Sequence, residues 1–173
     1  MSFAKTITGL IHLMRPAEWS KSLGNTALAA IVASYTMYAS PSLITFLLGF
    51  ASVALLWSGL YALNDYTDWQ KDAMHPVKKR RAIPSGAVSP ALGLAFSIIL
   101  IAIAFTIPFV FSLGTLFAVC LFVMLANQLF YTIKPWNFKK RPVLDLISGS
   151  MVNPLFRYYA GWVLFMPRFN SPI

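Results

Sequence analysis

The chain has 173 residues, of which 58% are hydrophobic and 11% are charged, and its mean hydropathy is +0.67. This composition places it among membrane proteins and argues against an ordinary soluble domain. A formal net charge of +9 could indicate nucleic-acid binding, but the cations fall in short clusters between apolar stretches, so nucleic acid is not an expected partner. The single cysteine, Cys120, lies in an apolar stretch and can form neither an intrachain disulfide nor a cysteine-based metal site.

The N-terminal segment 1–21 has apolar residues at helical spacing, which predicts a short cytoplasmic or interfacial amphipathic helix that Pro16 ends or bends. Five apolar stretches follow in residues 22–173, each close to the roughly 20 residues that a bilayer crossing needs. They are residues 22–39, 42–63, 90–111, 113–133 and 143–166. We therefore predict an all-α fold, a multi-pass transmembrane bundle of these five helices, with no removable signal peptide.

Serine and proline mark several of the expected helix boundaries. Ser40-Pro41 and Ser89-Pro90 each fit a helix start, with serine as the cap and proline as the first helical residue. Pro108 and Pro154 fall inside apolar stretches and predict kinks, because proline cannot donate a backbone hydrogen bond.

Basic residues alternate between the connections of the five stretches. They precede the first stretch and lie between the second and third and between the fourth and fifth, whereas the turns near 40 and 112 have none. All but two of the fourteen cations, Arg157 and Arg168, therefore fall on one side. The positive-inside rule predicts that the N-terminus and both charged loops are cytoplasmic, in a bacterial or archaeal cytoplasmic membrane.

A cluster of charge interrupts the apolar chain after the second stretch. If that helix continues past Asn64, then Asp65, Asp68 and Asp72 lie on one face within two turns. Three carboxylates on one face repel one another unless a cation neutralises them, and Mg²⁺ takes oxygen ligands of this kind. An ordinary solvated helix end is the alternative, but the acids follow a very apolar stretch and precede four consecutive cations at 78–81.

The pattern Asn64-Asp65-x-x-Asp68-x-x-x-Asp72 resembles the first aspartate-rich motif of the UbiA superfamily of intramembrane prenyltransferases. The loop that follows is also similar to the family's continuation, a basic, proline-containing segment that ends in a Pro-Ser-Gly turn. Here it reads His75-Pro76-x-Lys78-x-Arg80 and Ile83-Pro84-Ser85-Gly86.

The resemblance implies a UbiA-like fold and roles for particular residues. It implies that Mg²⁺ and the substrate diphosphate bind the motif residues, whose carboxylates are the catalytic groups: Asn64, Asp65, Asp68 and Asp72. Basic residues of the two polar loops are weaker candidates for binding the diphosphate: Lys78, Arg80, Lys134 and Arg141. The cations of the second loop have an alternative explanation: they would keep this loop on the cytoplasmic side of the membrane without binding substrate.

Two further segments resemble the branch of the family that transfers a phosphoribosyl group to a polyprenyl phosphate. One is Arg15-Pro16-x-x-Trp19-x-Lys21, and the other is Arg157 followed by Ala160-Gly161. The first could instead be an interfacial anchor of tryptophan and cations, and Arg157 could extend toward the membrane surface. Asp145 and Arg157 are too far apart along one helix to pair, so each needs another partner.

The reaction implied by the resemblance is Mg²⁺-dependent transfer of a prenyl group from a prenyl diphosphate, or of a phosphoribosyl group to a polyprenyl phosphate, with release of diphosphate. The expected partners are those substrates, a lipid-soluble or small acceptor, and membrane lipid. Family members generally have more transmembrane helices and a second aspartate-rich motif, which has no match after Asp72. The chain therefore resembles the first half of the family fold.

This departure leaves an alternative open. The chain could be a truncated or non-catalytic membrane subunit that keeps the substrate-side half of the site, and it would then pair with a C-terminal half or form a homo-oligomer. A small transporter or channel would also place polar groups in the membrane, but it offers no reason for three aspartates beside four cations.

Overall fold

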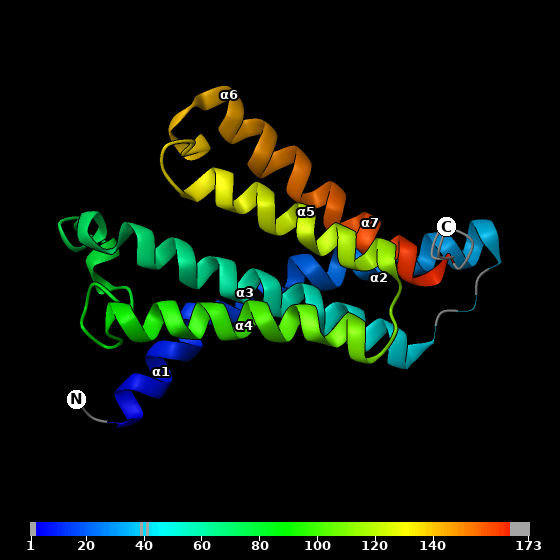
Figure 1. Cartoon of the computed structure of the whole chain (residues 1–173), viewed down its shortest axis with the longest axis horizontal. Helices are drawn as coiled ribbons and strands as arrows, with labels where there is room; N and C mark the ends of the chain where they lie inside the picture. The colour runs from blue at the N-terminus through cyan, green and yellow to red at the C-terminus, as the bar shows by residue number, and fades with distance from the viewer. Residues whose placement is uncertain (1–2, 39, 41, 167–173) are drawn as a thin grey trace.

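The computed structural model describes residues 3–38, 40 and 42–166, and every regular element among them is a helix (Figure 1). The α-helices are α1 Phe3–Met14, α2 Trp19–Met37, α3 Leu43–Ala73, α4 Pro90–Val110, α5 Thr115–Thr132, α6 Pro142–Asp145 and α7 Asn153–Phe165. A π-helix, Leu146–Val152, joins α6 to α7. Each of the five apolar stretches thus forms a helical path, and the predicted all-α bundle is confirmed.

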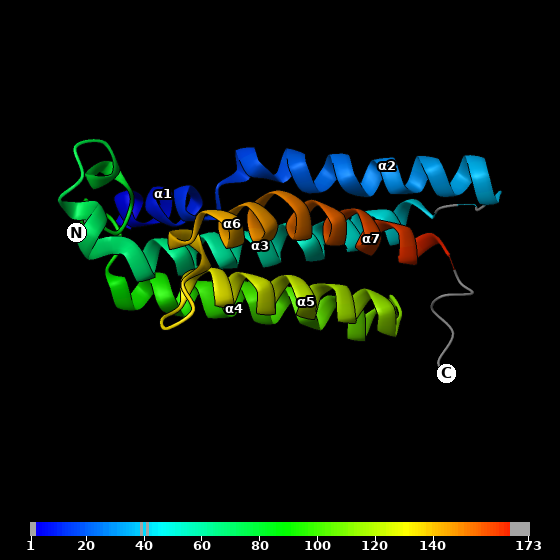
Figure 2. The same cartoon turned by 90° about the horizontal axis from the view of Figure 1, so that it is seen from above.

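The long helices lie side by side around α3, which contacts α1, α2, α4, α5 and α7 (Figures 1 and 2). Small residues bring α3 and α4 close together, since a Cβ added at Gly59 would lie 2.9 Å from the Ser97 carbonyl oxygen. The Ser97 hydroxyl donates to the Gly59 carbonyl at 2.7 Å. Close backbone approach through small residues is how helices associate in lipid, where no hydrophobic effect drives them together.

Apolar residues fill the centre of the bundle and also cover its outside. The inner faces of α3, α5 and α7 meet at side chains such as Leu60, Phe117 and Val163, all fully buried. Among the described residues, α3, α4 and α5 are long and apolar enough to cross a membrane. Their outward apolar residues, including Ile98, Phe109 and Phe122, remain exposed, as contact with lipid requires.

The start of α4 agrees with the predicted serine cap, whereas the start of α3 differs from it. α4 begins at Pro90, and the Ser89 hydroxyl accepts from the Leu92 amide at 3.3 Å, as predicted. The cap of α3 is Ser42, which accepts from the Thr45 amide, so the expectation that Ser40 caps this helix is wrong. Pro41 lies outside the described residues, and the helix begins after it because Ser42 supplies the first capping oxygen.

The last helical path widens where a kink was expected. The π-helix Leu146–Val152 ends just before α7, in which Pro154 is the second residue. Proline provides no amide hydrogen, so backbone carbonyls in the preceding turn need other donors. Asn127 of α5 also contacts this segment, since its Nδ2 donates to the Ser148 carbonyl at 3.3 Å.

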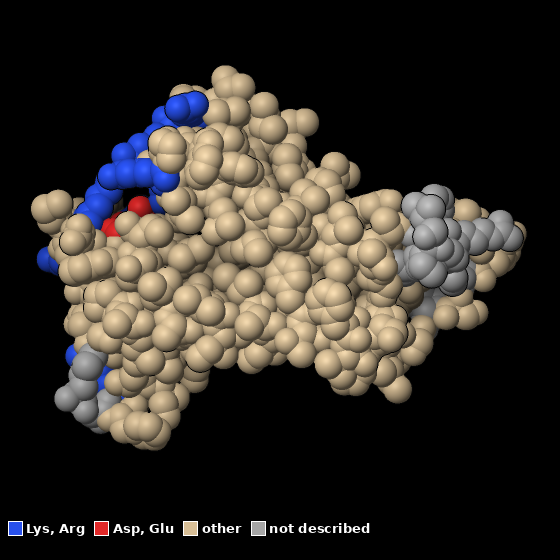
Figure 3. Space-filling view, in the orientation of Figure 1, with Lys and Arg blue, Asp and Glu red and all other residues tan. Residues whose placement is uncertain are grey.

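The basic connections share one end of the bundle. Residues 74–89 and 133–141 lie at the left of Figure 1, and Figure 2 shows the 15–18 connection between α1 and α2 in the left half of the molecule, whereas the 111–114 turn lies toward the other end. Figure 3 shows Lys and Arg side chains gathered at that left end on the face it displays. The grouping predicted from alternation is therefore observed, and the assignment of this end to the cytoplasm stays a prediction.

We expect a cysteine placed at Ser85, which is exposed in the 74–89 loop, to be reached by a membrane-impermeant maleimide only from the cytoplasmic side. The measurement is labelling of intact cells against inverted vesicles. The native Cys120 is buried and serves as an internal control of background labelling. Labelling of intact cells at position 85 would reverse the assigned orientation.

Candidate functional site

The last turns of α3 carry two buried carboxylates that share one arginine. Asp65 and Asp72 side chains are 5% and 4% exposed. Arg81 Nη1 lies 3.1 Å from Asp65 Oδ1 and 2.7 Å from Asp72 Oδ2, so it bridges the two acids from the loop that follows α3. Arg15 Nη2 donates to Asp65 Oδ1 at 2.6 Å, and Lys78 Nζ lies 3.9 Å from Asp72 Oδ1.

The third carboxylate faces a different cation. Lys139 Nζ donates to Asp68 Oδ1 and Oδ2 at 2.8 and 2.7 Å and to Asn64 Oδ1 at 3.2 Å. The Thr132 hydroxyl also donates to Asn64 Oδ1, at 3.4 Å. An amide oxygen and a carboxylate from adjacent turns of α3 therefore converge on one ammonium group from the 133–141 loop.

The predicted continuation of the helix past Asn64 is confirmed, but the three carboxylates do not meet at one point. Residues 65 and 72 are seven apart and lie almost above one another, whereas Asp68 is rotated toward α5 by the period of the helix. Asp65 and Asp72 therefore pair with Arg81, whereas Asp68 pairs with Lys139. No group of three or more acidic, histidine or cysteine side chains within residues 3–38, 40 and 42–166 is arranged to hold a metal.

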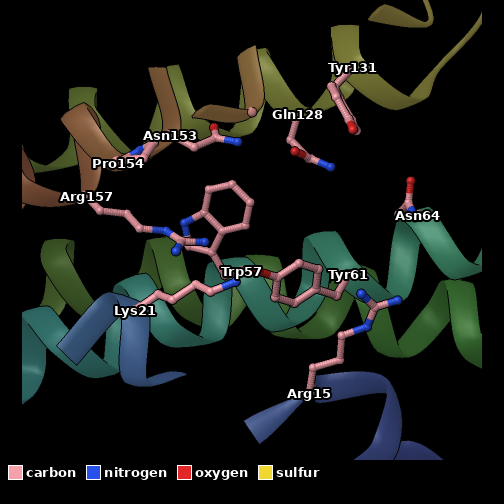
Figure 4. Close-up of a pocket in the computed structure, with 11 residues that line it drawn as sticks. Arg15, Lys21, Trp57, Tyr61, Asn64, Gln128, Tyr131, Asn153, Pro154 and Arg157 are labelled. Carbon is pink, nitrogen blue, oxygen red and sulfur yellow. The ribbon is translucent and has the colours of Figure 1, made fainter. Parts of the chain in front are cut away.

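A polar cavity of about 460 Å³ lies beside this network, between α3 below and α5 and α7 above (Figure 4). Its lining combines three cations, three amides, three aromatic rings, a glycine and a proline, without a carboxylate. The lining residues are Arg15, Lys21, Trp57, Tyr61, Asn64, Gln128, Tyr131, Gly149, Asn153, Pro154 and Arg157. Arg15 and Lys21 pair with acids outside the lining, Asp65 and Glu18, whereas Arg157 forms no ion pair among the described residues. Arg157 therefore gives the cavity a positive charge that can attract an anionic ligand.

Arg157 is the most deeply placed cation of the cavity. It is 6% exposed, and its guanidinium carbon lies 3.9 Å from the ring centroid of Trp57, as Figure 4 shows for the two side chains. Its buried Nε has no hydrogen-bond partner. Stacking on an indole stabilises the cation, and the Nε hydrogen remains available to a further acceptor. Arg157 therefore lines the cavity and does not extend to the membrane surface.

The Ala160-Gly161 pair explains how Arg157 reaches this place. A Cβ added at Gly161 would lie 2.9 Å from the Thr26 Cα and from the Ala29 Cβ, so glycine permits α7 to pack closely against α2. Arg157 stands one turn earlier on the same helix. Asp145 does not pair with Arg157. Its partner is Tyr131, whose hydroxyl donates to Asp145 Oδ1 at 2.8 Å.

The Arg15-Pro16-x-x-Trp19-x-Lys21 segment belongs to the site and is not only a surface anchor. The Trp19 indole donates to the Ser58 hydroxyl on α3 at 2.9 Å, which fixes the start of α2. Arg15 adopts a left-handed conformation, with φ 49°, between α1 and this segment. Its guanidinium lies 4.9 Å from the Tyr61 ring centroid and reaches Asp65, while Lys21 lines the cavity.

The four basic candidates chosen from sequence fall in different places. Lys78 is close to Asp72, and Arg80 lines a small cavity of about 150 Å³ that also includes Asp65. Lys134 and Arg141 are exposed, and neither forms an ion pair with the aspartates in the described part of the chain.

Sequence reasoning did not select the cations that contact the motif most closely. These are Arg15, Arg81 and Lys139. Each lies in a basic or motif-like segment that the sequence analysis recognised, but a run of consecutive cations gives no signal of which member turns toward the acids. The loop fold decides between neighbours such as Arg80 and Arg81.

Comparison with known proteins agrees with this architecture. The family model described as the UbiA prenyltransferase family matches residues 24–170. The chain belongs to the UbiA prenyltransferase family. Together with its three long apolar helices, this membership makes it a multi-pass integral membrane protein.

Curated relatives from this family carry several activities. A decaprenyl-phosphate phosphoribosyltransferase from Corynebacterium glutamicum is 26% identical over 172 residues, covering 94% of this chain and 51% of the relative. A digeranylgeranylglyceryl phosphate synthase from Methanothrix thermoacetophila is 32% identical over 141 residues, covering 82% of this chain and 49% of the relative. The chain thus spans about half the length of these UbiA-family relatives.

A solved UbiA homolog from Archaeoglobus fulgidus, bound to GPP and Mg²⁺, has the same fold. The two superpose with a TM-score of 0.77 at 20% identity, and the match covers 91% of this chain and 54% of the homolog. The fold of this chain therefore corresponds to about half of a UbiA fold.

Replacing Arg81 should destabilise this end of the bundle. Arg81→Gln leaves two buried carboxylates short of their shared partner, and removing one member of a buried ion pair costs about 3 kcal/mol or more. Arg15 and Lys78 remain near Asp65 and Asp72, so we expect a loss near the lower end. Thermal unfolding in detergent measures the change.

The matched control is Lys79→Gln, which removes the same charge from an exposed neighbour in the same loop. It should leave the unfolding midpoint almost unchanged, because exposed charges contribute little. Equal midpoints for Arg81→Gln and Lys79→Gln would contradict the bridging role of Arg81.

Proposed function

We propose that this chain forms the diphosphate-binding half of a Mg²⁺-dependent intramembrane transferase. The reaction is transfer of a prenyl group from a prenyl diphosphate, or of a phosphoribosyl group to a polyprenyl phosphate, with release of diphosphate. The observation that carries the proposal is the convergence of Asn64 and Asp68 oxygens on one cation at the mouth of a basic cavity. Membership of the UbiA family supports it.

The motif residues fit Mg²⁺ by their chemistry. Every donor is an oxygen, the ligand type that this hard cation prefers, and Lys139 Nζ occupies a position that three of these oxygens already share. Asn64 and Asp68 would hold the metal. Asp65 and Asp72, which Arg81 bridges, would add negative charge and further ligands from neighbouring turns of α3. The bound metal would stabilise the negative charge that grows on the departing diphosphate.

The cations of the network have a second task when a diphosphate is present. Arg15, Arg81 and Lys139 neutralise the aspartates in the described structure, and each carries N–H groups that can donate to phosphate oxygens. Lys78 and Arg80 in the first loop, and Lys134 and Arg141 flanking the second, would add a positive field at the same end. Charge held in place before the reaction lowers the barrier because it does not need to reorganise.

The central cavity would hold the reacting group next to the diphosphate. Its aromatic walls, Trp57, Tyr61 and Tyr131, exclude water from a carbon centre that loses its leaving group. Arg157 and Lys21 provide a second positive region away from the aspartates. This feature favours a second substrate that carries its own phosphate, as in the phosphoribosyl reaction, over a neutral acceptor.

A second candidate function rests on chain coverage. Because the chain spans about half the length of its relatives, it could serve as a non-catalytic or truncated membrane subunit that binds substrate and pairs with a C-terminal half or a second copy. Among the described residues, the aspartates of the site all come from one helix, α3. Activity of the chain without a partner separates the two candidates.

Asp68→Asn should abolish Mg²⁺-dependent transfer in a full-length context. The substitution removes the carboxylate that faces the 133–141 loop, and the loss of one such stabilising group costs roughly 100-fold or more in turnover. Membrane insertion should be unchanged, because Asp68 is not packed in the apolar core. Product formation and Mg²⁺-dependent binding of geranylgeranyl diphosphate are both measured.

Asp145→Asn is the control for this experiment, since the amide oxygen can still accept from Tyr131 and the carboxylate lies off α3. Its activity should stay close to that of the wild type. Undiminished turnover in Asp68→Asn, or in the wild type with EDTA, would exclude the metal role of the motif.

Residues 1–173 alone should have little or no transferase activity. The family's second aspartate motif has no counterpart in this chain, and metal and donor contacts to a developing anion each contribute several kcal/mol, or orders of magnitude in rate. The purified chain is assayed with geranylgeranyl diphosphate and a panel of acceptors, and with phosphoribosyl diphosphate and a polyprenyl phosphate. Robust Mg²⁺-dependent turnover by a monomer would show that this half is sufficient.

A further inference from the structure

A second basic cavity, separate from the central one, lies between α1 and the loop that follows α3. Its volume is about 430 Å³. It is lined by Ala4, Lys5, Thr8, Gly9 and His12 of α1 and by Arg80, Ala82, Ser85 and Ala87 of the loop. Neither the aspartate motif nor the central cavity accounts for it.

Both walls of this cavity are held in place by packing. A Cβ added at Gly9 would lie 2.7 Å from Val88 Cγ2, so α1 lies directly against the loop. Leu13 of α1 is fully buried in an apolar cluster with Ile83 and Val88. The loop closes on itself through the Val88 amide, which donates to the Ala82 carbonyl at 3.0 Å. The cavity therefore lies between two segments that pack together, while its polar side chains are exposed at its rim: Lys5, Thr8, His12, Arg80 and Ser85.

The lining supplies hydrogen-bond donors and positive charge without a matching acid. Lys5, His12 and Arg80 are basic, Thr8 and Ser85 add hydroxyl groups, and no carboxylate lines the cavity. Among the described residues, neither Lys5 nor Arg80 takes part in an ion pair. Arg80 thus differs from its neighbour Arg81, which is engaged by two aspartates. Such a set fits a phosphate group.

The position of α1 indicates where such a phosphate comes from. The other side of α1 carries three apolar side chains that are exposed, Phe3, Ile7 and Ile11. An amphipathic helix of this kind lies along the membrane surface with its apolar side among the acyl chains and its basic side at the headgroups. The loop that lines the cavity joins α3 to α4, two helices long and apolar enough to cross a membrane, so this loop is expected at the level of the lipid headgroups.

We propose that this cavity binds the headgroup of an anionic phospholipid, with Lys5 and Arg80 holding the phosphate. The lipid would fasten α1 to the 80–87 segment and so brace the loop from which Arg81 reaches Asp65 and Asp72. Of the lining residues, only Arg80 is also a candidate for the positive field around the diphosphate. The test below reads lipid binding and stability, so its outcome is separate from that of the transferase proposal.

The test uses the purified chain in neutral detergent with added phosphatidylglycerol or phosphatidylcholine. Native mass spectrometry counts retained lipid, and thermal unfolding reports its effect on stability. Phosphatidylglycerol should remain bound and raise the unfolding midpoint, whereas phosphatidylcholine should do neither. The double variant Lys5→Gln and Arg80→Gln should weaken phosphatidylglycerol binding by about tenfold, the loss expected when charge-assisted hydrogen bonds to one phosphate are removed.

The matched control removes two exposed cations that do not line the cavity, Lys79→Gln with Lys140→Gln. It should bind phosphatidylglycerol like the wild type. An equal loss in this control, or equal binding of the two lipids, would show general attraction to a positive surface and overturn the proposal. The unfolding measurement is repeated with inorganic phosphate in place of lipid. If millimolar phosphate raises the unfolding midpoint as much as phosphatidylglycerol does, the cavity binds a soluble anion and the lipid proposal is wrong.

A further measurement serves if the double variant does not fold. A cysteine at Ser85, which lines the cavity, is labelled with a soluble maleimide in the presence of each lipid. Phosphatidylglycerol should slow the labelling, and phosphatidylcholine should not. Labelling at the same rate with both lipids would exclude a headgroup at this position.

Discussion

The neutralisation of three aspartates at the end of a membrane helix is the constraint on which the rest of the structure depends. Charged groups next to an apolar bundle are costly unless they are paired and hydrogen-bonded. Here each carboxylate is met by a cation from another segment: Arg15 from the α1–α2 connection, Arg81 from the first loop and Lys139 from the second. The acids therefore determine how three connections fold around the end of α3.

The same contacts make the site one unit. Arg15 ties α1 and α2 to Asp65, and its neighbours Trp19 and Lys21 bring the start of α2 to Ser58 and into the central cavity. Lys139 ties the 133–141 loop, which joins α5 to α6, to Asn64 and Asp68. In a network of this kind, a metal ion could replace the basic side chains at the aspartates, and a phosphate could replace the aspartates at the basic side chains. The groups that now neutralise one another have the chemistry to bind a metal and a diphosphate separately.

Two positive regions beside one acidic face also explain the uneven distribution of charge. The central cavity holds Arg157 and Lys21 among aromatic and amide groups, while the cavity between α1 and the loop after α3 holds Lys5 and Arg80. Only the cations that face α3 are paired with the aspartates. The net charge of +9 is thus divided among structural pairing, a proposed substrate site and a proposed lipid site.

The sequence by itself determined the helical paths, the continuation of α3 and the placement of Asp65, Asp68 and Asp72 within two turns of that helix, because hydrophobic length and helical period are properties of a single segment. It could not determine that Arg81 rather than Arg80 meets the acids, that Lys139 meets Asp68 from 71 residues away, or that Arg157 stacks on Trp57. Those pairings depend on loop conformation and on close helix contacts such as Gly161 against α2, which no local pattern encodes. Only the tertiary structure decided them, since a side chain finds its partner across segments only after the helices have packed.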